Sequence, residues 1–377
     1  MSKLTSLMTP ACVIDAAKFQ HNIRRMQTVA ARDNLVLRPH VKTLKSLAAA
    51  EFYAPASGPI TVSTLAEAES FASAGYTDIL YAVGLVPNKF GRVAALSARA
   101  NKFTVVLDSM AAVNALIAYA TQLEHPLQVM LEVDVDDHRA GLLPVSDELV
   151  ACAKAIVSTP QLHFRGVMTH AGGSYDCFTQ QARDAIAEQE CQLIAKAAAR
   201  LAEHQIECEL VSAGSTPTAL ANTRHKGINE LRAGVYATFD CVMAGLGVCT
   251  VNDIALSVLT SVIGHQKDKN WVIVDAGWMA LSRDQGTASH AKNCGYGLVC
   301  NSDGEILDGW YVSSTNQEHG IISHIDGKQP DDALFGYGTM LRILPIHACA
   351  TAAQFETYQV VDTEGNVQDV WSRISGW

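Results

Sequence analysis

Three basic residues alternate along one short stretch of the sequence. The segment RPHVK places Arg38, His40 and Lys42 at every second position, and residues two apart on a strand point to the same side. A lysine that lies beside other cations and partly out of water has a lowered pKa, so it can form a Schiff base with a carbonyl compound. The alternatives are a solvated basic strand edge and a competing lysine, Lys45, in the loop or helix that follows.

A second pair of residues near the C-terminus could bind a metal. The segment PIHAC carries His347 and Cys349 two positions apart, and on a strand both side chains would point at one ion. Imidazole together with thiolate favours zinc over magnesium or manganese. Only two protein ligands are evident, which leaves positions for water and substrate, as a catalytic site requires. Taken alone, such a pair is more often a core cysteine beside an unrelated histidine.

The segment SAGSTPTAL predicts a phosphate-binding turn. Gly214, Ser215 and Thr216 directly precede Pro217, and a Ser or Thr cap followed by proline is typical of a helix start. Free backbone N–H groups and hydroxyls at such a start can bind phosphate. A lone turn of this kind is usually only a helix cap. Together with a Schiff-base lysine, it indicates pyridoxal 5'-phosphate as the cofactor.

The elements that would position these groups follow an alternating pattern over roughly the first 240 residues. β-rich runs alternate with Ala-rich amphipathic stretches, which predicts an α/β fold, a (β/α)8 TIM-type barrel, with a doubly wound open sheet as the rival. Catalytic residues of such barrels lie at the C-terminal mouth, and phosphate sites form after strands seven and eight. The predicted strands are 34–43, 59–64, 78–84, 103–109, 127–135, 162–172, 207–215 and 230–239, and the predicted helices are 65–75, 110–122, 146–159 and 178–204.

The pattern changes after about residue 245. Helical periodicity nearly vanishes, and strand-like runs are separated by turns such as SDGE, IDGK and TEGN. We therefore predict a barrel domain of residues 10–245 and a mainly β domain of residues 246–377, joined by residues 1–9. The β domain would carry the metal pair.

Composition restricts the class of partner and the compartment. The 377 residues carry a formal net charge of −10, which argues against nucleic acid or an anionic membrane surface. The 10 cysteines include no CxxC pair and are typical of reduced thiols in the cytoplasm. No apolar run approaches the ~20 residues of a membrane span, and the N-terminal residues lack the apolar core of a signal peptide. We expect a soluble cytoplasmic protein with a small-molecule partner, no nucleic acid and no membrane.

Several longer motifs resemble one enzyme family. In chain order they are RPHVKTLKS, VSTLAEAE, MTHAGGSY, VSAGSTPT, RAGVY, VIVDAGWMALSRDQGT, NQEHG and LPIHACAT. They resemble the fold type III pyridoxal phosphate enzymes, from about residue 9 to the terminal SGW. Within that family they resemble the metal-dependent branch of D-serine dehydratases, D-threonine aldolases and, most of all, D-threo-3-hydroxyaspartate dehydratases. Alanine racemase is a remote relative of the same architecture. The resemblance implies a homodimer.

The resemblance assigns roles to individual positions. Lys42 matches the catalytic lysine that bonds to the cofactor, His170 the histidine behind the cofactor ring, and Arg139 the arginine near its phenolic oxygen. Arg232 stands where the racemases place an arginine at the pyridine nitrogen, although several dehydratase and aldolase relatives lack it. The other positions that surround the phosphate and ring are Tyr175, Ser215, Thr216, Gly234 and Tyr236. Gln317 and His319 fall near the substrate or metal, with a turn histidine as the alternative for His319.

The activity that the resemblance implies is a pyridoxal phosphate- and zinc-dependent lyase. It would eliminate water from a 3-hydroxy D-amino acid, either D-threo-3-hydroxyaspartate or D-serine, to give a 2-oxo acid and ammonia. Lys42 would remove the α-proton as general base, and zinc on His347 and Cys349 would let hydroxide leave. A D-threonine aldolase-type retro-aldol enzyme is one alternative, but those aldolases typically carry an aspartate at the Cys349 position. The other alternative is a non-catalytic pyridoxal phosphate carrier.

Overall fold

The structure is a computed structural model that describes residues 3–377, and it divides into two compact units. The barrel unit consists of Arg25–Gly234 and Ile374–Trp377. The β unit consists of Val235–Arg373 and the N-terminal residues up to Arg24. The domain limits suggested by the sequence, with a boundary at residue 245, stay a prediction. No helix within residues 3–377 has the length and apolar character to cross a membrane.

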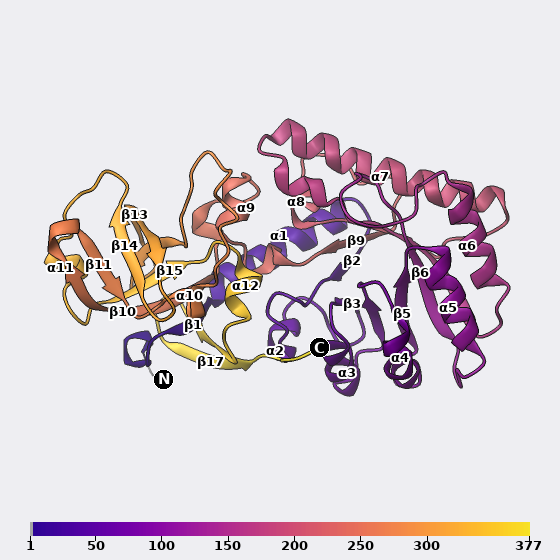
Figure 1. Ribbon diagram of the computed structural model, residues 1–377, viewed down its shortest axis with the longest axis horizontal. Helices are drawn as coiled ribbons and strands as arrows, with labels where there is room; N and C mark the ends of the chain where they lie inside the picture. The colour runs from indigo at the N-terminus through magenta and orange to yellow at the C-terminus, as the bar shows by residue number, and fades with distance from the viewer. Residues whose placement is uncertain (1–2) are drawn as a thin grey trace. The chain divides into compact units, whose positions relative to one another are not determined.

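The barrel unit confirms the predicted (β/α)8 barrel (Figure 1). Its eight strands pair in parallel in the order β2-β9-β8-β7-β6-β5-β4-β3. A parallel bridge between His40 and Thr61 joins the two ends of this sheet. Every predicted strand is present, although shorter than predicted. The strands are β2 (Val36–Pro39), β3 (Pro59–Val62), β4 (Asp78–Tyr81), β5 (Lys102–Leu107), β6 (Leu127–Glu132), β7 (Leu162–Met168), β8 (Leu210–Ala213) and β9 (Glu230–Ala233).

The first barrel strand ends earlier than the sequence suggested. Strand β2 ends at Pro39, which has no N–H to donate, and only the isolated bridge at His40 lies beyond it. Lys42 is therefore in the turn of residues 41–44. The prediction that Lys42 and Arg38 line one face of a strand is wrong.

The four predicted helices of the barrel unit are confirmed to within about two residues at each end. A Ser or Thr before each of them accepts a hydrogen bond from a backbone N–H of the first turn, which satisfies one of the unpaired N–H groups there. These helices are α3 (Leu65–Ser73), α5 (Met110–Ala120), α6 (Asp147–Val157) and α7 (Gln180–Glu203). The unit also contains α2 (Leu47–Ala50), α4 (Phe90–Ser97), α8 (Thr216–Ala219) and the end of α1 (Ala16–Arg32).

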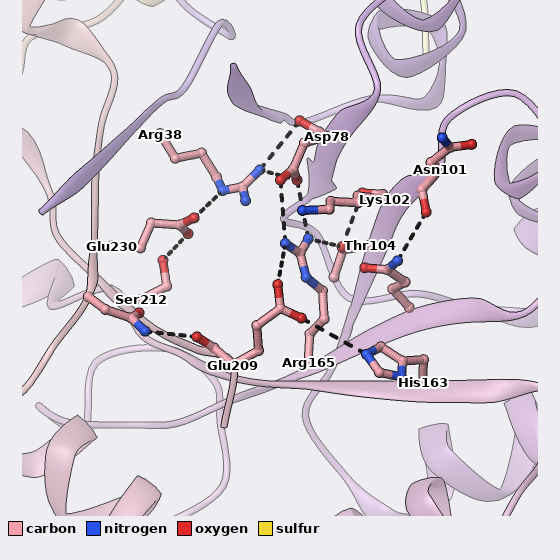
Figure 2. A network of polar contacts seen from close by, with 12 residues as sticks. Arg38, Asp78, Asn101, Lys102, Thr104, His163, Arg165, Glu209, Ser212 and Glu230 are labelled. Atoms are coloured by element: carbon pink, nitrogen blue, oxygen red, sulfur yellow. Dashed lines mark hydrogen bonds and ion pairs between the residues drawn. The ribbon is translucent and has the colours of Figure 1, made fainter. Parts of the chain in front are cut away.

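A network of ion pairs links side chains from several barrel strands (Figure 2). Arg38 Nε lies 2.8 Å from Glu230 Oε2, and Arg38 Nη1 lies 2.9 Å from Asp78 Oδ1. Arg165 contacts the same oxygen of Asp78 at 3.2 Å and also contacts Glu209 at 3.2 Å. Arg38, Arg165 and Glu230 are almost fully buried, so each of these charges needs its opposite partner. Arg38 is thus a structural cation inside the barrel.

Replacing Arg38 with leucine should lower the free energy of unfolding by about 3–5 kcal/mol, because Glu230 would keep a buried charge without an ionic partner. Urea unfolding followed by circular dichroism measures this loss. The matched control is Arg92→Ala, which removes an exposed pair with Glu69 at 2.8 Å and should cost no more than about 1 kcal/mol. Equal losses in the two variants would contradict the structural role of Arg38.

The β unit is a nine-stranded, mainly antiparallel sheet, which confirms the predicted β-rich C-terminal region. Its order is β11-β14-β13-β12-β15-β10-β1-β16-β17, so the N-terminal strand β1 lies between two C-terminal strands. The strands are β1 (Ala11–Asp15), β10 (Leu256–Gln266), β11 (Trp271–Val274), β12 (Leu298–Asn301), β13 (Ile306–Thr315), β14 (Gly320–His324), β15 (Met340–Leu344), β16 (Thr357–Val361) and β17 (Val367–Ser372). The short helices are α9 (Cys241–Gly245), α10 (Trp278–Leu281), α11 (Asp332–Phe335) and α12 (Ala348–Ala352).

The metal pair is not on a strand, which corrects a second prediction. Strand β15 ends at Leu344, directly before Pro345, which has no N–H for a sheet ladder. His347 is the residue before α12, and Cys349 lies in its first turn. Their shared direction therefore depends on the start of a helix.

Candidate active site

The structure distinguishes the two lysines that follow β2. Lys45 Nζ lies 3.2 Å from Glu67 Oε2, and Glu67 is fully buried. The same carboxylate oxygen accepts hydrogen bonds from the hydroxyls of Ser63 and Thr64. Lys45 is thereby held in a structural pair. Lys42, three residues earlier, is exposed in the turn that follows β2, where its amine can meet a ligand.

Cations gather around two histidines at this end of the barrel. Burial and neighbouring cations lower the pKa of His170 to about 3. In order of effect, those cations are Lys42, Arg139 and Arg232. The pKa of His40 is also lowered, first by burial and then by Lys42 and Arg232. The structure therefore brings these five side chains near one another, with the two imidazoles neutral.

The two arginines of this group are fixed in different ways. Arg232 is buried and donates from Nη1 to Ser212 Oγ at 2.7 Å and from Nη2 to the Thr169 carbonyl. Arg139 is 60% exposed at its side chain and lies 3.2 Å from Glu132 Oε1. Burial raises the pKa of Glu132, while the nearby Arg139 lowers it. Arg232 is thus held by hydrogen bonds to neutral groups, whereas Arg139 is largely exposed and pairs with one carboxylate.

The turn between β8 and α8 has the hydroxyls and conformation that the sequence suggested. Gly214 adopts a φ of +124°, and a Cβ there would lie 2.4 Å from the Arg232 carbonyl oxygen, so only glycine fits. Ser215 caps α8 by accepting from Thr218 N at 3.2 Å. Thr216 Oγ1 is buried and has no hydrogen-bond partner within the described residues. A buried hydroxyl without a partner is costly, so this atom indicates a polar ligand.

Glu190 of α7 supports the same turn from behind. Its Oε1 accepts from Gly214 N at 3.2 Å and from Ala171 N at 2.9 Å. It therefore ties the end of β7, which carries His170, to the turn after β8. Burial raises the pKa of this carboxyl, and its backbone hydrogen bonds lower it.

The remaining predicted cofactor residues differ in their surroundings. The Tyr175 ring lies 6.4 Å from the His170 ring, centroid to centroid. A Cβ on Gly234 would lie 3.2 Å from His40 Cβ, so the glycine allows close approach there. Tyr236 belongs to the β unit and is fully buried. Its Oη has no hydrogen-bond partner in the part of the chain that the structure describes, and burial raises its pKa.

These residues fit pyridoxal phosphate. The amine of Lys42 can bond to an aldehyde, Thr216 Oγ1 needs a polar partner, and the cations match a phosphate and a phenolate oxygen. His170 is neutral at pH 7 because its pKa is about 3, so its ring can pack on an aromatic cofactor without repelling the nearby cations.

In the β unit, the structure brings His347 and Cys349 into contact. Their side chains hydrogen-bond to each other, and His347 Nδ1 lies 2.7 Å from Asp284 Oδ2. Burial opposes a charged imidazole, but these two partners raise the pKa of His347 to about 11. No group of three or more potential metal-ligating side chains occurs within residues 3–377. The donor set of one imidazole and one thiol fits a metal that keeps positions open.

Asp284 is a site residue that the sequence alone did not identify. It lies 63 positions from His347 in the chain, so no local spacing relates them. The only available signal was its place within the motif VIVDAGWMALSRDQGT. Asp240 is also far from the pair in the sequence. It supports the pair because its Oδ2 accepts a hydrogen bond at 2.9 Å from the backbone N of Ala348, which lies between His347 and Cys349. The predicted substrate residues Gln317 and His319 are exposed in the turn between β13 and β14 of the same unit.

Two family profiles match the chain. The profile described as "Alanine racemase, N-terminal domain" matches residues 14–241, and a serine dehydratase domain profile matches residues 255–361. D-threo-3-hydroxyaspartate dehydratase from Delftia sp. (strain HT23) is 47% identical over 99% of this chain and 99% of its own length. The chain belongs to the alanine racemase-like pyridoxal phosphate family.

Other comparisons agree with this family membership. D-serine dehydratase from Dictyostelium discoideum is 28% identical over 99% of this chain and 98% of its own length. The solved structure of the Delftia dehydratase has a TM-score of 0.95 and covers 100% of both chains at 47% identity. Two solved structures of D-threo-3-hydroxyaspartate dehydratase mutants have TM-scores of 0.96 and 0.97. The first is a histidine-to-alanine mutant, and the second is a cysteine-to-alanine mutant in the metal-free form. These relatives in the alanine racemase-like family are dehydratases of D-amino acids.

Proposed function

We propose that the protein is a pyridoxal phosphate- and zinc-dependent dehydratase of a 3-hydroxy D-amino acid, giving a 2-oxo acid and ammonia. The observation that carries this proposal is the contact between His347 and Cys349, held by Asp284. Hydroxide is a poor leaving group, so its elimination calls for a metal. The 47% identity to a D-threo-3-hydroxyaspartate dehydratase over nearly the whole chain supports this substrate class.

Lys42 would act as the general base. When bound, pyridoxal phosphate delocalises negative charge at the α-carbon, and the metal withdraws charge from the β-oxygen. The Lys42 amine would hold the cofactor between turnovers and remove the proton from the α-carbon during the reaction. Arg139 and Arg232 are the cationic neighbours that act on His170 together with Lys42, so the base would lie in the same cluster as the residues that hold the cofactor.

Other barrel residues would bind and orient the cofactor. The backbone and hydroxyls of Gly214, Ser215 and Thr216 would hold the phosphate, with the hydroxyl of Tyr236 as a further donor. Neutral His170 would pack behind the ring, and Arg139 would meet the phenolic oxygen. Arg232 donates to Ser212 and to the Thr169 carbonyl, and these bonds would hold it in place if it meets the ring nitrogen, as the resemblance to the racemases implies.

His347 and Cys349 would hold the metal, with Asp284 as a positioning residue. Asp284 Oδ2 accepts from His347 Nδ1, so it sets the tautomer and leaves Nε2 for coordination. Thiolate with imidazole favours zinc. In the solved D-threo-3-hydroxyaspartate dehydratase mutants, the mutated histidine and cysteine are also two positions apart, and the cysteine mutant is described in a metal-free form.

Asp284→Asn should weaken zinc binding about 10–100-fold, because an amide orients the imidazole less strongly than a carboxylate does. Competition with a chromogenic chelator measures the affinity, independently of turnover. Asp326→Asn is the matched control, since Asp326 lies beside a different histidine, His324, at 3.8 Å. Unchanged zinc affinity in Asp284→Asn would contradict the positioning role.

Product analysis tests the proposed reaction. The protein with pyridoxal phosphate is incubated separately with D-threo-3-hydroxyaspartate, D-serine and D-threonine, with a chelator or with added zinc. We expect oxo acid and ammonia that are lost with chelator and restored by zinc. Glycine and an aldehyde from D-threonine would instead identify a retro-aldol enzyme, and absence of turnover on every substrate would leave a cofactor carrier.

Two further expectations accompany the proposal. The 10 cysteines are all free thiols, which supports a reducing, cytoplasmic location. We also expect a homodimer, on the basis of the family resemblance. Light scattering of the purified protein would give the mass of the assembly, and a monomer would overturn this expectation.

A further inference from the structure

Two cysteines of the β unit are in contact although they are far apart in the sequence. The side chains of Cys241 and Cys294 hydrogen-bond to each other, and both are free thiols. Cys241 begins α9, and its sulfur lies 3.7 Å from the Leu344 carbonyl oxygen. The sulfur of Cys294 lies 3.7 Å from the Lys292 carbonyl oxygen. The Cys241 sulfur is thus held against the end of β15, and the Cys294 sulfur is held within its own segment.

The accessibility of the two thiols differs. Cys241 is 1% exposed and Cys294 is 6% exposed. Residues 291–293, directly before Cys294, are exposed, so this thiol lies just beneath the surface at the end of an irregular segment. A small oxidant therefore reaches Cys294 first, and Cys241 lies behind it.

The segments that the two cysteines join both support the metal pair. Cys241 N donates to the Pro345 carbonyl at 3.0 Å, and the preceding residue, Asp240, accepts from Ala348 N. On the other side, the segment that ends in Cys294 carries Asp284, the partner of His347. A covalent bond between the cysteines would fasten together the two segments that hold His347.

We propose that Cys241 and Cys294 form a dithiol modification site that a peroxide oxidises to an intramolecular disulfide and that a thiol reductant restores. The Cys294 sulfur attacks one oxygen of hydrogen peroxide, the O–O bond breaks, and a sulfenic acid and water result. The Cys241 sulfur then attacks the sulfur of that sulfenic acid, the S–O bond breaks, and a second water leaves. Two thiols together lose two hydrogens and two electrons, and one peroxide is reduced to two waters.

The order of these steps follows from the contact between the two sulfurs. The contact with the Cys241 thiol lowers the pKa of Cys294 to about 7, against the opposing effect of burial. The thiolate is the reactive form of cysteine, so Cys294 reacts first. Cys241 is already in contact and completes the bond, which protects Cys294 from further oxidation.

Peptide mapping after peroxide treatment tests the site in the wild-type protein. The reduced full-length protein is treated with increasing concentrations of hydrogen peroxide and then denatured in the presence of an alkylating agent that blocks the remaining thiols. It is then digested and analysed by mass spectrometry. We expect a linked pair of peptides containing Cys241 and Cys294, lighter by two hydrogens and separated by dithiothreitol. The lone buried thiols Cys152 and Cys300 are internal controls and should stay alkylatable at the same dose. Recovery of Cys241 and Cys294 as free thiols at a dose that oxidises the more exposed Cys177 would overturn the proposal.

A variant gives a second, independent readout. In Cys241→Ala, the Cys294 sulfenic acid has no resolving thiol, so dimedone should label Cys294 in the variant and not in the wild type. Equal labelling of Cys294 in both proteins would also overturn the proposal. Neither measurement depends on the proposed dehydratase activity, so failure of that function and failure of this site are separate results.

Discussion

Lys42→Ala is expected to lose dehydratase turnover by about 10⁴-fold, because it removes the general base. The variant should also lose its covalent bond to pyridoxal phosphate. Borohydride reduction followed by peptide mapping should therefore label the wild-type peptide at Lys42 and no peptide in the variant. Steady-state kinetics with D-threo-3-hydroxyaspartate gives the turnover.

Lys45→Ala is the matched control for this experiment. Lys45 is three residues away and carries the same functional group, but it is paired with buried Glu67. Its loss should reduce stability and leave the cofactor label on Lys42. A label on Lys45, or full turnover in Lys42→Ala, would refute the assignment of the base.

Cys349→Ala is expected to lose bound zinc and to reduce turnover by about 10³-fold, since a metal acting as Lewis acid contributes several kcal/mol to the barrier. Elemental analysis after dialysis gives the metal content, and the release of oxo acid gives the rate. The variant should lose elimination but keep removal of the α-proton, because the predicted base, Lys42, is a different residue and belongs to the barrel unit.

Two further variants serve as comparisons for Cys349→Ala. Cys349→Asp should keep a metal site but shift its preference toward manganese or magnesium, because a carboxylate is a harder ligand than a thiolate. Cys300→Ala removes a buried thiol from another strand of the same unit, β12, and should keep its zinc. Full zinc content in Cys349→Ala would exclude this cysteine as a ligand.

The barrel could be predicted from the sequence because its signals are local. Each strand is a short β-rich run and each of the four predicted helices begins after a Ser or Thr cap, so both appear within a few residues of sequence. The turn at Gly214 was predictable for the same reason, since the glycine, the cap and the proline are adjacent. Such features depend on backbone preferences that neighbouring residues set.

The details that could not be predicted depend on long-range packing or on where an element stops. The pairing of Asp284 with His347 joins residues 63 positions apart, and Glu190 reaches Gly214 across 24 positions. Alternation of Arg38 and Lys42 suggested one strand face, but Pro39 ends the strand between them. Strand β15 likewise ends directly before Pro345, so the metal pair lies at the start of a helix and not on a strand.

The central claim is a division of roles, in which Lys42 removes the α-proton and the metal on His347 and Cys349 expels the β-hydroxyl. Metal-free wild-type protein with pyridoxal phosphate is incubated with D-threo-3-hydroxyaspartate in D₂O, and NMR follows deuterium at the α-carbon alongside oxo acid. We predict exchange of the α-hydrogen without oxo acid, and release of oxo acid once zinc is added. Release of oxo acid at the full rate without metal, or absence of exchange until zinc is added, would contradict this division.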